Sequence, residues 1–172
     1  MTAVVSNPRG DCWVRTLLSG RPHQIVDSDD GPYLHRWYLI PHNRRLNVYL
    51  HKFVRSDDPG PLHDHPWAFL SIILSRGGYR EVTEAGEVWR RRGSVAWRRA
   101  AHRHRVELLR DRHGRELPCW TIIVTGARRR AWGFWCPLPG GRKRFVGWQD
   151  FGPGGCGEIT DSPVSAGDSS EA

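Results

Sequence analysis

The 172-residue sequence lacks the features that mark several classes of protein. It contains no run of about 18 apolar residues, so no membrane-spanning helix is predicted. Its N-terminal stretch, MTAVVSNPRGDCWVRTLLSG, lacks the basic segment followed by an apolar segment that identifies an export signal. We therefore expect a soluble, cytoplasmic protein with no membrane partner, and a chain of this length suits a single domain.

Cysteine is sparse and widely spaced, at Cys12, Cys119, Cys136 and Cys156, with no CxxC pair. Without an export signal, such spacing favours neither a zinc knuckle nor a disulfide framework. We expect all of these cysteines to be reduced thiols, with Cys119 and Cys136 inside the protein.

Acidic residues are fewer than basic ones. The chain has 18 Asp and Glu and 26 Lys and Arg, which gives a net charge of +8. This charge fits a nucleic-acid partner, an anionic substrate or a chain that is merely rich in arginine. The arginines gather in residues 89–105, 127–132 and 140–145, where they alternate with apolar residues. The solvent face of strands is therefore the favoured interpretation, and nucleic acid is a weaker alternative.

Helical periodicity is missing from the long segments, and period-2 alternation takes its place. Residues 45–54, for example, put Asn47, Tyr49, His51 and Phe53 on one face of a strand. Turn-rich sequences such as RSDDPGP and SRGG separate this strand from several other short ones. The pattern predicts an all-β fold with a closed or double-sheet architecture.

The two ends of the chain differ from its middle. Residues 11–20 allow either a short helix or an added strand. From residue 152 onward the sequence GPGGCGEITDSPVSAGDSSEA is rich in Gly, Ser and acidic residues, a composition typical of disorder. We predict one β-barrel domain over residues 1–151, with its core at about 33–150, and a flexible tail over 152–172.

Two pairs of histidines have HxH spacing: His63 and His65 in PLHDHPWAFLSIIL, and His102 and His104 in AAHRHRVELL. Residues i and i+2 of a strand point to the same side, so His63 and His65 can reach one ion while Asp64 faces away. The second pair shares its face with apolar residues and therefore also points inward. Metal binding is favoured over a histidine pair that is merely hydrogen-bonded in a loop.

These motifs resemble those of the cupin superfamily. The first family motif is matched by His63, His65 and the glycines of the SRGG turn, and the second by Gly93 and, eleven residues later, His104. The sequence also departs from the family. No glutamate stands at the family spacing after His65, and the proline, glycine and asparagine of the second motif are replaced by Arg99, Ala101 and Leu108.

The resemblance implies a single-domain, cupin-like double-stranded β-helix, or jelly-roll barrel, with a short N-terminal extension. It implies a site in which His63, His65 and His104 hold one divalent transition metal, with Fe(II) favoured and Ni, Mn or Zn as alternatives. It also implies that a homodimer could form through an added edge strand, for which the N-terminal segment is the candidate.

Other polar residues are candidates for further roles at this site. Glu81 is the preferred fourth ligand, with His102 or His51 as alternatives, because the sequence GGYREV returns a strand beside the metal-binding strand. Glu81, Tyr79 and Tyr49 are the candidate catalytic groups for proton transfer or substrate orientation.

The favoured function is that of a mononuclear metal-dependent cupin enzyme, a non-haem Fe(II) oxygenase or dioxygenase acting on a small polar or anionic substrate. Arg80 or Arg99 could pair with a substrate carboxylate or phosphate at the mouth of the barrel. Two alternatives stay open, because one fold hosts many functions. They are a non-catalytic cupin that binds a small ligand or a polyanion, and a metal-dependent isomerase.

Overall fold

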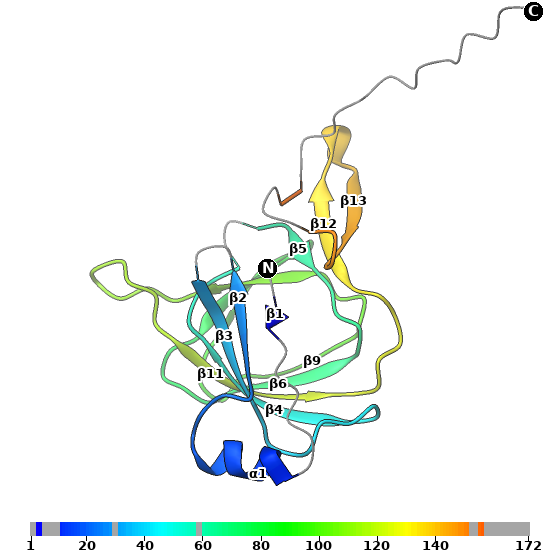
Figure 1. The fold of residues 1–172 in the computed structure, drawn as a ribbon. Coiled ribbons are helices and arrows are strands. Elements are labelled where there is room, and N and C mark those ends of the chain that lie inside the picture. Colours follow the sequence, from blue (N-terminus) through cyan, green and yellow to red (C-terminus); the bar gives the residue numbers. More distant parts are fainter. Residues whose placement is uncertain (1–2, 5–10, 29–30, 58–59, 152–154, 157–172) are drawn as a thin grey trace, which may run out of the picture.

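Two antiparallel β-sheets face each other in the computed structural model, which describes residues 3–4, 11–28, 31–57, 60–151 and 155–156 (Figure 1). The first sheet has the order β1-β2-β3-β4-β11-β6-β9. Its strands are β1 (Ala3–Val4), β2 (Gln24–Ser28), β3 (Gly31–Tyr38), β4 (Asn47–Phe53), β6 (Phe69–Ile73), β9 (Val95–Arg98) and β11 (Cys119–Thr125).

The second sheet has the order β13-β12-β5-β10-β7-β8. Its strands are β5 (Leu62–His63), β7 (Tyr79–Thr83), β8 (Gly86–Arg90), β10 (His104–Leu108), β12 (Gly133–Pro137) and β13 (Lys143–Gly147). A short 3-10 helix, η1 (Pro139–Gly141), joins the last two strands.

The strand order is that of a jelly roll. From β4 to β11 the chain passes back and forth between the sheets, except at the β7–β8 hairpin, and so produces β4-β11-β6-β9 opposite β5-β10-β7-β8. This arrangement defines the double-sheet jelly roll, the architecture of the cupins. The all-β, cupin-like fold predicted from the sequence is confirmed.

The N-terminal extension contains a helix, which decides between the two alternatives for residues 11–20. Helix α1 (Asp11–Leu18) lies at one end of the sandwich, and β1 pairs with β2 and forms the edge of the first sheet (Figure 1). The indole Nε1 of Trp13 donates a hydrogen bond to the Tyr38 carbonyl at 2.8 Å and so ties the helix to β3. No helix in the described part of the chain is long and apolar enough to cross a membrane.

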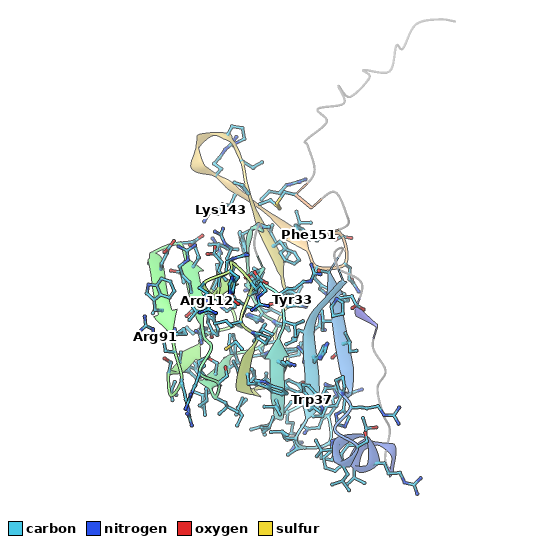
Figure 2. The ribbon with its side chains drawn as sticks, turned by 90° about the vertical axis from the view of Figure 1, so that its left-hand side faces the viewer. Tyr33, Trp37, Arg91, Arg112, Lys143 and Phe151 are labelled. Atoms are coloured by element: carbon cyan, nitrogen blue, oxygen red, sulfur yellow. A yellow bond between two sulfur atoms is a disulfide. The ribbon has the colours of Figure 1, made fainter. Side chains whose placement is uncertain are left out.

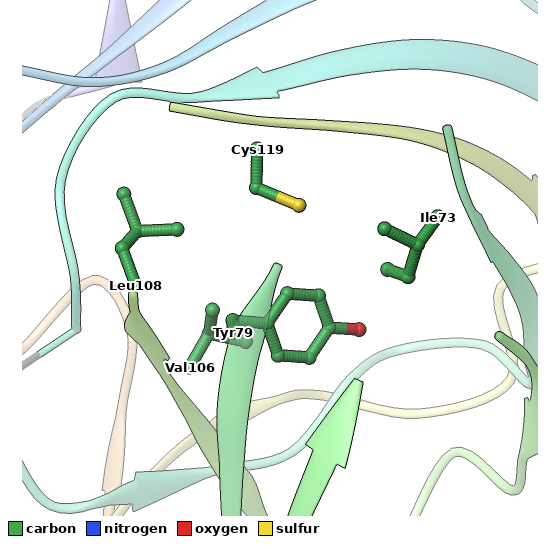
Figure 3. Packing of buried hydrophobic residues seen from close by; sticks show 5 residues of the cluster. All are labelled: Ile73, Tyr79, Val106, Leu108 and Cys119. Carbon is green, nitrogen blue, oxygen red and sulfur yellow. The ribbon is translucent and has the colours of Figure 1, made fainter. Parts of the chain in front are cut away.

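Alternation of side chains along the strands builds the interior. In β11 every second residue is buried, and in β4 the buried positions are Asn47, Tyr49 and His51. One apolar cluster lies between the sheets and comprises Ile73, Tyr79, Val106, Leu108 and Cys119 (Figure 3). The sequence prediction that Cys119 lies inside is confirmed, and burial raises the pKa of its thiol to about 11.

The β12–β13 hairpin projects beyond the sandwich, with Lys143 on it (Figure 2). Below it, Phe151 stacks on Phe134 with ring centroids 3.8 Å apart. Cys136 is buried, as predicted, but it forms a disulfide with Cys156. The prediction of reduced thiols is therefore wrong for this pair, because the chain after β13 folds back against β12 and brings together cysteines that the sequence separates.

Other predictions fall outside what the structure describes. Gly155 and Cys156 are the described part of the predicted tail, and residues 152–154 and 157–172 lie outside it. The side chain of Cys12 also lies outside it.

Breaking the disulfide should destabilise the protein. Cys136 and Cys156 are 20 residues apart, and closing a loop of that size restricts the unfolded chain enough to contribute about 3 kcal/mol. We expect Cys156→Ser to lower the free energy of unfolding by about that amount under non-reducing conditions, measured by urea denaturation. Reductant should lower the midpoint of the wild type and leave that of Cys156→Ser unchanged. An equal response of both proteins would contradict the assignment.

Candidate metal centre

The site is assembled by the pairing of β10 with β5. His63 is the last residue of β5, and the register places it directly opposite His104, the first residue of β10. His65 follows two residues after His63, and its backbone N–H donates to the Ala100 carbonyl at 3.0 Å. The ring centroids of His63, His65 and His104 lie 5.0 to 5.1 Å apart. The structure thus brings together the three histidines that the sequence singled out.

The donor atoms of these histidines fit a single ion. Each histidine offers one ring nitrogen, and these nitrogens all lie within 4.8 Å of one another. The Nε2 atoms of His65 and His104 are 2.8 Å apart. Two nitrogens bound at right angles to one ion, each about 2.1 Å from it, would be about 3 Å apart. The spacing and the donor type therefore suit a divalent transition metal.

Burial keeps these imidazoles in the form that binds metals. Desolvation lowers the pKa of His104 to about 4, although Glu81 opposes the shift. Desolvation also holds the pKa of His65 well below its usual range, with the neighbouring His63 and His104 adding to the effect. The rings of His65 and His104 are therefore neutral at pH 7, and a metal ion would not have to displace a proton from either of them.

Glu81 orients His104 from β7, the strand beside β10. Its Oε1 accepts a hydrogen bond from His104 Nδ1 at 3.0 Å and contacts His102 Nε2 at 3.2 Å. Because an ionised carboxylate only accepts, Nδ1 of His104 carries the proton and Nε2 presents its lone pair toward His65. A carboxylate behind a histidine is the usual arrangement for fixing the tautomer of a metal ligand.

Two arginines complete the surroundings of Glu81, which is fully buried. Arg98 reaches both carboxylate oxygens at 2.5 Å, and Arg90 Nε donates to Oε2 at 2.8 Å. Burial alone would raise the pKa of Glu81, but hydrogen bonds from His102, His104 and Arg98 hold it well below its usual range. Glu81, His102 and His104 form a second group of donors that could hold a metal, but the Glu81 oxygens are already occupied by these hydrogen bonds.

The HxH segment is anchored by the two aspartates near it. Asp64 faces away from the site, as its position between the histidines predicts, and is fully buried. It accepts hydrogen bonds from the Gly133 N–H and from Trp135 Nε1, both at 3.1 Å. Asp57 accepts from the Val106 N–H at 2.6 Å and lies 3.8 Å from Nδ1 of His63. These contacts fix β5 between β10 and β12.

The two candidate tyrosines are buried in the interior. Tyr79 packs in the apolar cluster of Figure 3, where its hydroxyl interacts with Ser71 and Arg98. Tyr49 packs with Tyr38, Phe69 and Ile123. Phe69 in turn contacts His65, with ring centroids 4.7 Å apart. Tyr49 is thus separated from His65 by Phe69.

The remaining candidates lie elsewhere. Arg80 points to the outer face of β7, where it pairs with Glu107 and with Glu87, and Arg99 is exposed. His51 lies on β4 and bonds to Arg36 rather than to the histidine group. The interior cations are instead Arg98 and Arg36. Sequence reasoning missed both, although each occupies a position that points into the interior.

A cavity of about 1130 Å³ reaches His63 from outside. It lies among the segment before β5, the β12–β13 hairpin and the loop after β10, and Phe134 and Phe151 form part of its wall. Its lining is rich in cations: Arg55, Arg105, Arg110, Arg115 and Lys143. A pocket of this size and charge can admit a small anionic molecule.

No protein-family model matches the chain, and no curated protein matches it. Among solved structures, the polyketide cyclase RemF from Streptomyces resistomycificus is 16% identical, with 66% of this chain and 72% of that chain covered and a TM-score of 0.47. KdgF from a Halomonas species is 19% identical, with 59% and 87% covered and a TM-score of 0.45. A cupin domain from Bordetella pertussis is 17% identical, with 62% and 95% covered and a TM-score of 0.39. The strand order of the two sheets is what identifies the fold as a jelly roll.

Proposed function

We propose that the chain is a mononuclear metal-dependent enzyme in which His63, His65 and His104 hold one divalent transition metal. The observation that carries this proposal is the pair of Nε2 atoms 2.8 Å apart, one of them oriented by the buried Glu81. His65 and His104 can share one hydrogen bond at this distance, whereas a single ion could take a lone pair from all three histidines at once. Fe(II) is the favoured metal, and Ni, Mn or Zn are the alternatives.

In this proposal Glu81 is a positioning residue rather than a fourth ligand. It holds the proton of His104 at Nδ1, and Arg98 and Arg90 keep the carboxylate ionised and in place. Removing Glu81 would deprive the buried Arg98 of its counter-ion and the Nδ1 of His104 of its acceptor. Glu81, held by Arg98 and Arg90, would thus keep the ring of His104 in one orientation.

The substrate would enter by the cation-lined cavity that ends at His63. Arg55 and Arg105 would attract a small anion, whereas Arg80 and Arg99 have no part in this cavity. Burial raises the pKa of Tyr79, so its hydroxyl is protonated at neutral pH and could donate a proton or a hydrogen bond. Tyr49 would serve to orient the substrate.

Aromatic side chains surround the histidines and would keep water away from the reaction. Phe69 and Trp132 contact His65, and Phe134 contacts His63. When bound, Fe(II) supplies O2 activation, and Ni, Mn or Zn supply Lewis-acid polarisation of the substrate. Aromatic rings on one side of the site would shield reactive species from water, so we favour an oxygenase, with a metal-dependent isomerase as the alternative.

Metal replacement tests this proposal. Metal-free protein would be loaded anaerobically with Fe(II), Ni, Mn or Zn and mixed with a panel of small carboxylates and phosphate esters. We expect O2 uptake with the Fe(II) form and one class of compound, and no uptake in His104→Ala. Conversion of a compound without O2 uptake would replace the oxygenase by an isomerase. Tight metal binding without conversion of any compound would support a non-catalytic binding protein and overturn the proposal.

A further inference from the structure

A row of polar side chains crosses the inner face of the first sheet. The β3–β4 register pairs Arg36 with His51, and the β4–β11 register pairs His51 with Thr121. We call these three residues the polar row. His51 is 5% exposed and Thr121 is fully buried. The rows on both sides are apolar or aromatic: Leu34, Phe53 and Cys119 on one side, and Tyr38, Tyr49 and Ile123 on the other.

The hydrogen bond between Arg36 and His51 determines where the histidine carries its proton. Arg36 Nε donates to His51 Nε2 at 2.8 Å. A guanidinium has no acceptor, so Nε2 accepts and the neutral ring carries its hydrogen on Nδ1. Burial, followed by the charge of Arg36, holds the pKa of His51 well below its usual range and keeps the ring neutral. His51 Nδ1 is therefore a donor, and it is buried without a hydrogen-bond partner.

The other members of the polar row also lack an acceptor of suitable charge. The Thr121 hydroxyl is buried and without a hydrogen-bond partner. Arg36 is half-buried, donates to the Gln24 side-chain oxygen at 2.9 Å and lies 4.9 Å from the centre of the Tyr49 ring, but it pairs with no carboxylate among the described residues. Arg98, the other interior arginine, is neutralised by Glu81. Burying a charge without a counter-ion is costly, as is burying a donor without an acceptor.

We propose that the polar row binds the oxyanion group, a carboxylate or a phosphate, of a small ligand. Its oxygens would accept from His51 Nδ1 and the Thr121 hydroxyl and would neutralise Arg36. Charge-assisted hydrogen bonds of this kind are stronger than neutral ones. A single acceptor with a negative charge would therefore satisfy all three groups of the polar row.

The polar row is linked to the histidines by packed aromatic side chains. His51 stacks on Tyr49 with centroids 5.5 Å apart, Tyr49 packs with Phe69, and Phe69 contacts His65. Tyr49 and Phe69 would thus lie between the bound oxyanion and the candidate metal centre. If that centre acts as proposed above, its substrate carries an oxyanion at one end and the reacting group at the other. This link rests on the proposed function, whereas anion binding by the polar row does not.

Thermal unfolding of metal-free protein in formate, acetate or inorganic phosphate, with chloride at equal ionic strength as the reference, tests the site. The midpoint of the wild type should rise with the concentration of at least one oxyanion, because a ligand of the folded state stabilises it. Comparison of the carboxylates with phosphate identifies the group that the row prefers. Arg36→Met should abolish the rise, and Thr121→Val, which keeps the shape of the side chain, should reduce it.

A second readout separates binding from a structural role. Without added anion, Arg36→Met removes a charge that has no counter-ion but also loses the hydrogen bonds to His51 and Gln24, so its unfolding temperature should lie close to that of the wild type. A lower midpoint together with an undiminished anion response would overturn the proposal, as would a wild type that responds to no oxyanion, which would mean that the row holds water only. If Arg36→Met does not fold, Thr121→Val decides.

The same measurement in His104→Ala distinguishes failure of this site from failure of the metal centre. A rise that persists in His104→Ala and disappears in Arg36→Met assigns the anion to the polar row. The reverse pattern would place the anion at the histidines and overturn the inference, while leaving the proposed function standing.

Discussion

Replacing His63 or His104 with alanine should remove the metal from a protein that stays folded. Each substitution deletes one of the three nitrogens that converge on the candidate site, and a set of two neutral imidazoles binds divalent ions far more weakly. We expect bound metal to fall from about one equivalent to near none, as measured by elemental mass spectrometry of protein purified without a histidine tag. Circular dichroism should retain the β-sheet signal.

The matched control is His113→Ala. His113 is exposed in the loop after β10, where its ring accepts a hydrogen bond from the neighbouring Arg112 at 3.0 Å. Its removal should change neither the metal content nor the spectrum. Equal metal content in all three variants would show that the ion, if any, binds elsewhere.

Glu81→Gln should weaken both the fold and the metal site. The substitution leaves Arg98, whose side chain is 2% exposed, without a counter-ion, and breaking a buried ion pair in this way costs about 3 to 5 kcal/mol. It also removes the carboxylate that fixes His104, and loss of such a partner typically costs about 10- to 100-fold in metal affinity. Urea denaturation of the metal-free protein and metal titration measure the two effects separately.

Glu84→Gln provides the control for this variant. Glu84 also pairs with two cations, Arg103 and Lys143, but its side chain is 45% exposed. Pairs on the surface contribute about 0 to 1 kcal/mol, so this variant should be nearly as stable as the wild type and should bind metal equally well. If Glu81→Gln behaves like Glu84→Gln, then the network around Glu81 does not position His104.

Local patterns accounted for much of the architecture. Alternation of apolar and polar residues depends on the geometry of a single strand, and it predicted the all-β fold and which side chains of β4 share a face. The HxH spacing likewise depends on one strand, and the offset from Gly93 to His104 marked the histidine that would meet the pair. These signals lie within short segments, so a sequence displays them directly.

Contacts between distant strands could not be read in this way. Glu81 meets Arg98 and His104 only because β7 lies next to β10 in one sheet and faces β9 of the other. The disulfide was missed for the same reason, since Cys136 and Cys156 are joined by the return of the chain after β13. Arg80 was favoured for the pocket by sequence, although alternation in β7 turns it outward once Tyr79 and Glu81 face the core.

The sequence by itself determined the strand pattern, the jelly-roll class of fold and the histidines that point inward, because each depends on the geometry of one strand or on a short motif. Only the tertiary structure decided which carboxylate holds His104, which arginine lacks a counter-ion, and where a cavity reaches His63. Those properties belong to pairs of side chains on different strands. The chemistry of each side chain depends on its burial and on its partners, and both arise only when the sheets pack together.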